Sequence, residues 1–378
     1  MTRVMLNYEG LKVCVGTDAS DDAVWLEEFL LPWFAPIGDT PDVTVTLTYD
    51  GARFQDLRAG GPLGGQRRVF MLDTRTLDLP CWNVPGHDIA LYDADHHLFY
   101  LVREQHIELV AAEAHTDSRI NLMRVVRELA MGIAQLRGHR FLHASAFSLN
   151  GRAAIISGRR EAGKTSLLTY ALTRSPGGFL TNDRLLVRTA GAATTVRGMP
   201  TIVSIRDGTM DLFPGMREQI GARGYRCRAT LAEAQQPEKL ALIPAKQGAG
   251  SITPRQFCTL LGREPVAEAK AAVLLFPRQS GQPGGLELRR LDASTASMQL
   301  RQGLFGHIGP DRLSEVFTVL PTGLTRRRAP DDHTLCQQLA ASVPAWECLL
   351  GRDSYRDSRG ADALLELLNH DCSPDPGN

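Results

Sequence analysis

The sequence is short of lysine and carries no surplus of either charge. Only five of its 42 basic residues are Lys, and 42 acidic residues balance them to a formal net charge of zero. This balance argues against a protein that mainly coats nucleic acid or an anionic membrane, because such proteins need excess cations over one face. With so few lysines, a Lys at a particular place is more informative than usual.

Paired cysteines and long apolar runs are also absent from the sequence. The seven Cys are scattered and never spaced C-x-x-C, which fits neither a disulfide framework nor a zinc site. The first ten residues lack the apolar core of a signal peptide, and the longest apolar run, 271–276, is far too short to span a membrane. We therefore expect a cytoplasmic protein with no membrane or nucleic-acid partner.

The N-terminal third has the pattern of β-strands. Residues 43–49 alternate apolar side chains with Thr, which is typical of a strand with one buried face. Further strands are predicted at 68–72, 87–92, 98–103 and 106–111, with a turn at 93–95. Residues 1–115 are thus predicted to form a mainly antiparallel β region.

A different period begins at Asp117, where apolar residues recur every three or four positions up to Gly138. We predict a connecting helix over 116–138. Strand and helix patterns then alternate, which indicates an α/β domain over 139–370 followed by a tail at 371–378. The predicted strands are 141–148, 153–157, 179–181, 185–188, 271–276 and 346–350, and the predicted helices are 164–174 and 361–369.

One segment carries a recognisable chemistry. Residues 158–165, Gly-Arg-Arg-Glu-Ala-Gly-Lys-Thr, match the P-loop or Walker A pattern G-x-x-x-x-G-K-[ST], between a predicted strand and a predicted helix. In such a loop, backbone N–H groups and the helix N-terminus bind phosphate, Lys164 reaches the β- and γ-phosphates, and the Thr165 hydroxyl binds Mg²⁺. The alternative is a glycine-rich turn with an incidental Lys. The predicted nucleotide-binding residues are Gly158, Glu161, Ala162, Gly163, Lys164, Thr165 and Ser166.

A carboxylate is expected near the phosphates. Asp183 follows the next predicted strand, about 20 residues beyond the loop, where P-loop enzymes need a group that binds metal or orients water. Its alternative role is to cap a turn. His143, on an apolar strand, is either a catalytic residue or an ordinary core histidine.

The residues around the loop resemble the HPr kinase/phosphorylase family. The similarity lies in Phe-Leu-His-Ala-Ser at 141–145, the P-loop, and Thr-Asn-Asp-Arg-Leu-Leu-Val at 181–187; it covers about 139–210 and continues weakly to 370. It implies a PEP-carboxykinase-like core that uses ATP and Mg²⁺ to phosphorylate a hydroxyl, usually of Ser. It also implies that Asp183 binds the metal and that His143 lies near the catalytic acid.

Two positions depart from the family pattern. Asn182 stands where the family has the Asp that acts as general base, and an amide cannot accept a proton at neutral pH. Thr195 stands where a metal-associated Glu precedes an Arg-Gly pair. The predicted catalytic residues are His143, Lys164, Asn182 and Asp183, with Thr165 and Asp183 as metal ligands.

Two functions follow. The first is an ATP-dependent kinase acting on a hydroxyl of a peptide, protein or small molecule, since phosphoryl transfer depends more on positioning and charge neutralisation than on a strong base. The second is a nucleotide-binding regulatory or assembly protein without phosphotransfer, which the two departures favour. Another P-loop ATPase or GTPase class is disfavoured, because no apolar run ends in Asp-Glu and no N-K-x-D step occurs. Association into a homo-oligomer stays open.

Overall fold

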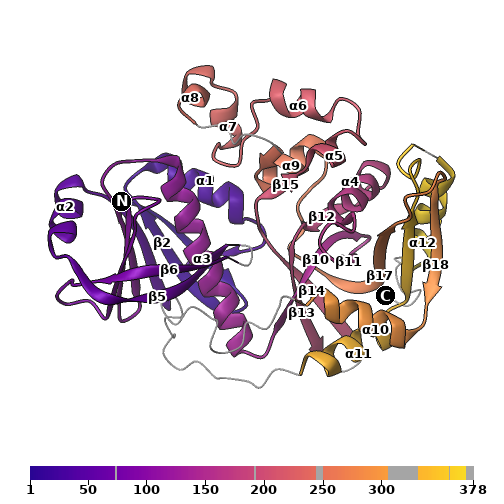
Figure 1. Cartoon of the computed structure of the whole chain (residues 1–378), viewed down its shortest axis with the longest axis horizontal. Coiled ribbons are helices and arrows are strands. Elements are labelled where there is room, and N and C mark those ends of the chain that lie inside the picture. Colours follow the sequence, from indigo (N-terminus) through magenta and orange to yellow (C-terminus); the bar gives the residue numbers. More distant parts are fainter. Residues whose placement is uncertain (73–74, 191–192, 244–249, 305–330, 357, 372–378) are drawn as a thin grey trace. The chain divides into compact units, whose positions relative to one another are not determined.

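The computed structural model describes residues 1–72, 75–190, 193–243, 250–304, 331–356 and 358–371. The chain divides into two compact units, one formed by residues 1–138 and the other, in its described part, by 139–304 and 331–371 (Figure 1). The predicted tail, 371–378, lies outside the described residues except for Asp371. The chain is a mixed α/β protein with two large sheets.

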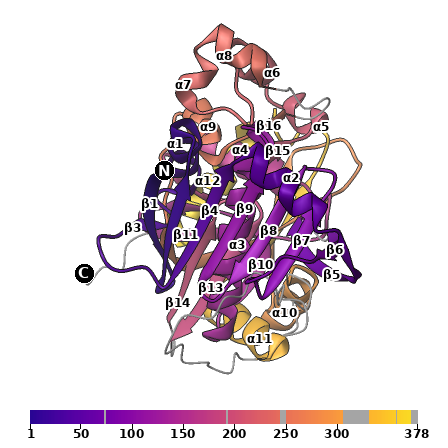
Figure 2. The ribbon, with the colours of Figure 1, turned by 90° about the vertical axis from the view of Figure 1, so that its left-hand side faces the viewer.

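The N-terminal unit is built on one sheet. Its strands are β1 (Thr2–Tyr8), β2 (Leu11–Thr17), β3 (Ala35–Pro36), β4 (Val43–Tyr49), β5 (Pro62–Leu72), β6 (Arg75–Trp82), β7 (Ile89–Asp93), β8 (Leu98–Arg103) and β9 (His106–Ala111). In the described part of the chain they pair in the order β3-β1-β2-β4-β9-β8-β7-β6-β5 (Figure 2). The pairings are antiparallel except for β2–β4 and β4–β9, so the predicted mainly antiparallel region is confirmed.

In its described part this unit also has the helices α1 (Ser20–Leu30), α2 (Gly51–Ala59) and α3 (Thr116–Leu136). The predicted helix corresponds to α3. Its N-cap is His115, whose side chain accepts a hydrogen bond from the backbone N–H of Asp117 in the first turn. Helix α3 packs against α1, β2 and β4. The predicted connecting segment therefore belongs to the N-terminal unit.

The C-terminal unit alternates strands and helices. Its strands are β10 (Arg140–Leu149), β11 (Arg152–Ser157), β12 (Gly178–Thr181), β13 (Arg184–Ala190), β14 (Ala193–Met199), β15 (Val203–Ile205), β16 (Gly250–Ile252), β17 (Glu268–Gln279), β18 (Leu286–Leu291) and β19 (Ala345–Leu350). Its helices are α4 (Lys164–Arg174), α5 (Asp207–Met210), α6 (Met216–Ala222), α7 (Leu231–Ala234), α8 (Pro237–Leu242), α9 (Pro254–Leu261), α10 (Ala293–Gln302), α11 (Asp332–Ser342) and α12 (Ser358–Asp371).

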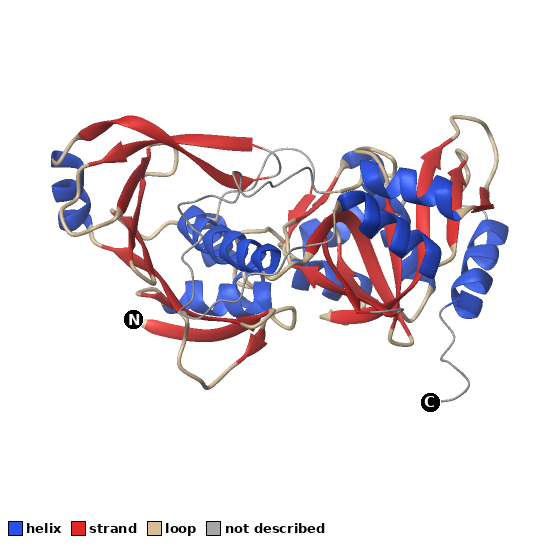
Figure 3. Cartoon of the chain, turned by 90° about the horizontal axis from the view of Figure 1, so that it is seen from below, coloured by secondary structure: helices blue, strands red, loops and turns tan. Residues whose placement is uncertain are grey.

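Strand β17 organises the second sheet. The strand order is β11-β10-β13-β14-β17-β19-β18, and β17 also pairs with β11, so β11, β10, β13, β14 and β17 close a ring. Because β17 pairs in parallel with both β11 and β19, the carboxyl ends of these three strands meet at one edge. Helix α12, the blue helix nearest the C label in Figure 3, packs against α4, β17 and β18. Helices α10 and α11 pack together and contact β19 and β14 respectively.

Burial explains this arrangement. The strand residues Ala153, Ile155, Leu274 and Phe276 are at most 2% exposed and belong to one apolar cluster with side chains of α10 and α11. A strand that is buried on both faces reads as a continuous apolar run, as 271–276 does. The closed ring buries the middle of these strands away from water, so polar side chains lie at the strand ends.

Candidate functional site

The glycine-rich loop, 158–163, lies at the edge where the three parallel strands end. It leaves β11 and leads directly into α4, so the predicted strand, loop and helix are confirmed. The backbone is left-handed at Glu161 (φ 68°) and at Gly163 (φ 102°). The left-handed backbone at residue 163 favours glycine, and a Cβ there would lie 2.9 Å from the amide nitrogen at the flexible end of the Gln279 side chain, which would have to shift. The first N–H groups of an 11-residue helix are thus presented beside a tight loop, an arrangement that favours an anion.

Lys164, the first residue of α4, is folded onto this loop. Its side chain is buried, and its Nζ donates hydrogen bonds to the carbonyl oxygens of Gly158 (2.9 Å) and Arg159 (3.1 Å). Burial lowers the pKa of Lys164, while the negative charge of Asp183 opposes this shift. The ammonium group therefore lies at the loop and within the electrostatic field of Asp183.

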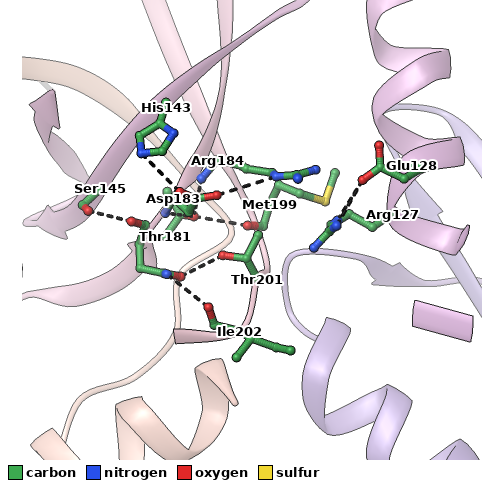
Figure 4. Close-up of polar contacts among 11 residues, drawn as sticks. Arg127, Glu128, His143, Ser145, Thr181, Asp183, Arg184, Met199, Thr201 and Ile202 are labelled. Carbon is green, nitrogen blue, oxygen red and sulfur yellow. Dashed lines mark hydrogen bonds and ion pairs between the residues drawn. The ribbon is translucent and has the colours of Figure 1, made fainter. Parts of the chain in front are cut away.

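Strand β10 brings His143 next to Asp183. On one side of β10, Ala144 pairs with Ser157 at the start of the loop, and on the other His143 pairs with Arg184. The His143 Nε2 lies 3.4 Å from one carboxylate oxygen of Asp183 (Figure 4). The side chains are 38% and 21% exposed, so both remain accessible to a bound group.

Asn182 is held by hydrogen bonds to a neighbouring segment. The Thr201 hydroxyl donates to its side-chain oxygen (2.9 Å), and its amide nitrogen donates to the carbonyl of Ile202 (3.4 Å). Its backbone carbonyl accepts a hydrogen bond from the Ser145 hydroxyl (2.7 Å; Figure 4). Asn182 thus ties the end of β12 to the segment that follows β14.

The remaining loop residues lie where the sequence places them. Glu161 and Ala162 lie in the loop, and Thr165 and Ser166 follow Lys164 in the first turn of α4. Ser166 is buried and shares a hydrogen bond of 2.9 Å with the hydroxyl of Thr209 in α5. The structure therefore brings together the loop, His143, Asn182 and Asp183 at one edge of the sheet.

Thr195 lies elsewhere. In β14 it pairs with Arg188 and with Lys270, four residues before Met199, which pairs with Arg184 at the edge of the site. Four residues of strand correspond to about 13 Å. We therefore do not expect the Thr195 side chain to contact a metal ion bound beside Asp183.

The sequence did not reveal three further contacts at the loop. Arg206, just before α5, forms an ion pair of 2.8 Å with Glu161. Gly303, after α10, accepts a hydrogen bond from the His143 N–H (2.7 Å), and a Cβ there would lie 2.4 Å from the Ser157 hydroxyl. The Tyr355 hydroxyl lies near Gly163, and the Tyr355 ring packs edge-on against Tyr170. The only sequence signal was the presence of isolated Arg, Gly and Tyr residues in loops, which is too common to single them out.

The donor set near the loop is suited to a hard cation. Thr165 offers a hydroxyl and Asp183 a carboxylate, and Mg²⁺ commonly takes one or two protein oxygens together with phosphate oxygens and water. Within the described ranges no cluster of three or more His, Cys, Asp or Glu side chains is placed to hold a metal ion alone.

Comparison with known proteins adds no assignment. No protein-family model matches the chain, and no curated protein matches it. None of the helices in the described part of the chain has the length and apolar content needed to cross a bilayer.

Proposed function

We propose that this protein is an ATP-dependent kinase that transfers the γ-phosphoryl group to a hydroxyl of a peptide, protein or small molecule. The observation that carries the proposal is the buried Lys164 on a glycine-rich loop, with the His143–Asp183 pair on the adjoining strand end. A buried cation beside the first N–H groups of a helix suits a polyphosphate better than a neutral ligand. The resemblance to the HPr kinase/phosphorylase pattern supports the same reading.

Each side chain has a defined task in this proposal. When ATP binds, Lys164 Nζ donates hydrogen bonds to oxygens of the β- and γ-phosphates in place of the carbonyl oxygens of Gly158 and Arg159. Thr165 and Asp183 would hold Mg²⁺, which neutralises phosphate charge when bound. The bond from the γ-phosphorus to the bridging oxygen breaks as the bond to the acceptor oxygen forms, and ADP leaves. The acceptor proton passes late to His143, which Asp183 orients through the 3.4 Å contact.

Asn182 positions the acceptor in this scheme and takes no proton. Its side chain contacts Thr201 and Ile202, so it fixes the segment against which the acceptor hydroxyl would lie. The same contacts support the alternative function, a nucleotide-binding regulatory or assembly protein, because an amide engaged in this way supplies no base.

Acceptor labelling distinguishes the two functions. The wild type and Asn182→Asp are incubated with γ-labelled ATP, magnesium and a lysate of the source cells across pH 6 to 9, with Lys164→Ala as the blank. A kinase labels an acceptor, and Asn182→Asp raises the rate by up to the order of 10²–10⁴-fold that a general base supplies. Normal ATP binding without a labelled acceptor in either protein would support the regulatory function and overturn the kinase.

A further inference from the structure

The ion pair between Glu161 and Arg206 joins the glycine-rich loop to a distant segment. Glu161 lies within the loop, and its carboxylate accepts a hydrogen bond of 2.8 Å from the Arg206 guanidinium, 45 residues away in sequence. The arginine lowers the pKa of Glu161, so the pair is charged. Glu161, an acidic residue in a loop suited to phosphate, is therefore already paired with the guanidinium of Arg206.

The backbone of Arg206 is fixed on both sides. It follows β15, whose Val203 and Ile205 are fully buried and whose strand pairs with β16. Three residues later, Thr209 shares its buried hydrogen bond with Ser166 of α4. Arg206 is thus anchored to the helix that begins at the loop, and this anchor uses no atom of the guanidinium.

The Arg206 side chain, by contrast, makes an exposed contact with Glu161 among the described residues. The Arg206 side chain is 54% exposed and the Glu161 side chain 66%, so water and salt weaken their attraction. A phosphoryl group carries more charge than a carboxylate and offers the planar guanidinium two oxygens at once. An anion in the loop would therefore compete well for Arg206.

We propose that Arg206 is a catalytic residue that leaves Glu161 and binds the phosphoryl group during transfer, as an arginine finger supplied by the same chain. The inference rests on the proposed function. Its physical basis is that charge on the transferred group needs a positioned cation, and a fixed backbone with a movable side chain provides one. Glu161 then acts as the resting partner that holds the guanidinium near the loop.

The test uses a mimic of the transferred group and needs no acceptor. Titration calorimetry of the full chain measures the affinity for ADP with magnesium, alone and with aluminium fluoride. The wild type is expected to bind ADP–aluminium fluoride more tightly than ADP. In Arg206→Ala, the ratio of the affinity for ADP–aluminium fluoride to the affinity for ADP should be at least tenfold smaller than in the wild type, while the affinity for ADP stays within about twofold. The decrease should be smaller in Arg206→Lys. Arg217→Ala, which removes an exposed arginine paired with Asp207 and Asp211, is the matched control and should keep the gain.

Glu161→Gln separates a catalytic from a structural role. It breaks the ion pair by removing the charge of Glu161 in place of that of Arg206. The gain in affinity should increase, because the Glu161 carboxylate no longer competes with aluminium fluoride for the Arg206 guanidinium. If Glu161→Gln and Arg206→Ala both reduced the gain, or if Arg206→Ala kept it, the pair would be structural and the inference would be overturned. A folded wild type that bound no nucleotide would overturn the proposed function as well, whereas normal nucleotide binding with an unaffected Arg206→Ala would overturn this inference alone.

Discussion

Two aspartates, one in each unit, show how the same side chain serves different purposes. In the N-terminal unit, Asp22 accepts a hydrogen bond of 2.5 Å from the Tyr49 hydroxyl and lies 2.9 Å from Arg119 Nε. The Asp22 and Arg119 side chains are 5% and 7% exposed. Burial and the neighbouring Asp22 charge raise the pKa of Tyr49, so its hydroxyl stays a neutral donor.

Asp183 in the C-terminal unit is held more loosely. Its contacts with His143 (3.4 Å) and with Arg184 Nε (3.7 Å) are longer than hydrogen bonds of good geometry. Its side chain is 21% exposed, and the adjoining loop carries a buried lysine. The comparison indicates that a carboxylate with short contacts and full burial, such as Asp22, stabilises the fold. A carboxylate with long contacts and partial exposure, such as Asp183, is able to bind a ligand.

The largest effect should follow Asp22→Asn. The substitution removes the carboxylate charge that lies 2.9 Å from the buried Arg119 Nε, and we expect a loss of about 3–5 kcal/mol of stability. Denaturant unfolding followed by tryptophan fluorescence measures this, since Trp25 and Trp33 are fully buried in the same unit. A loss below about 1 kcal/mol would show that Asp22 and Asp183 do not differ in the way described.

Lys164→Ala should have the next largest effect, on ligand affinity. Removing the buried cation should weaken ATP binding by on the order of 2–5 kcal/mol. Calorimetry against Lys12→Ala provides the control, because Lys12 is an exposed lysine paired with Asp39 in the other unit. Unchanged ATP affinity in a folded Lys164→Ala protein would contradict the phosphate-binding role of the loop.

Asp183→Asn should change stability by only about 1 kcal/mol, because a partly exposed, loosely paired charge contributes little. It should nevertheless remove magnesium-dependent turnover, since it deletes a hard anionic ligand and preserves volume. ATP binding without metal should stay nearly unchanged. Turnover that survived in this variant would mean that the metal ligand is another residue.

The smallest effect concerns the pH dependence of stability. Because burial lowers the pKa of Lys164, the unfolded chain holds this proton more tightly than the folded chain. The free energy of unfolding should therefore rise with pH between the lowered pKa and the ordinary value of 10.5. Lys164→Met should lack this rise, because it has no proton to lose in this range. Parallel stability profiles of the two proteins would contradict a charged buried lysine.

Local patterns in the sequence predicted much of the fold. The alternation in 43–49, the helical spacing after residue 116 and the loop at 158–165 each depend on neighbouring residues, and each element was found. Other elements gave weaker signals. The short helices α5 to α9 are not predicted by the sequence, because a helix of four to eight residues has too few turns to show a period.

The sequence by itself identified the residues whose side chains or backbone can bind a ligand or take part in a reaction: Lys164 and the glycines around it, His143, Asn182 and Asp183. Only the tertiary structure decided their relations. The sheet ring places β10, the strand of His143, between β11 and β13 and so brings His143 to Asp183; the Thr201 and Ile202 contacts engage Asn182, and Arg206 contacts Glu161, 45 residues away. The physical reason is that periodicity records which side of an element is buried, whereas the partner of a polar group is set by strand pairing between segments far apart in the chain.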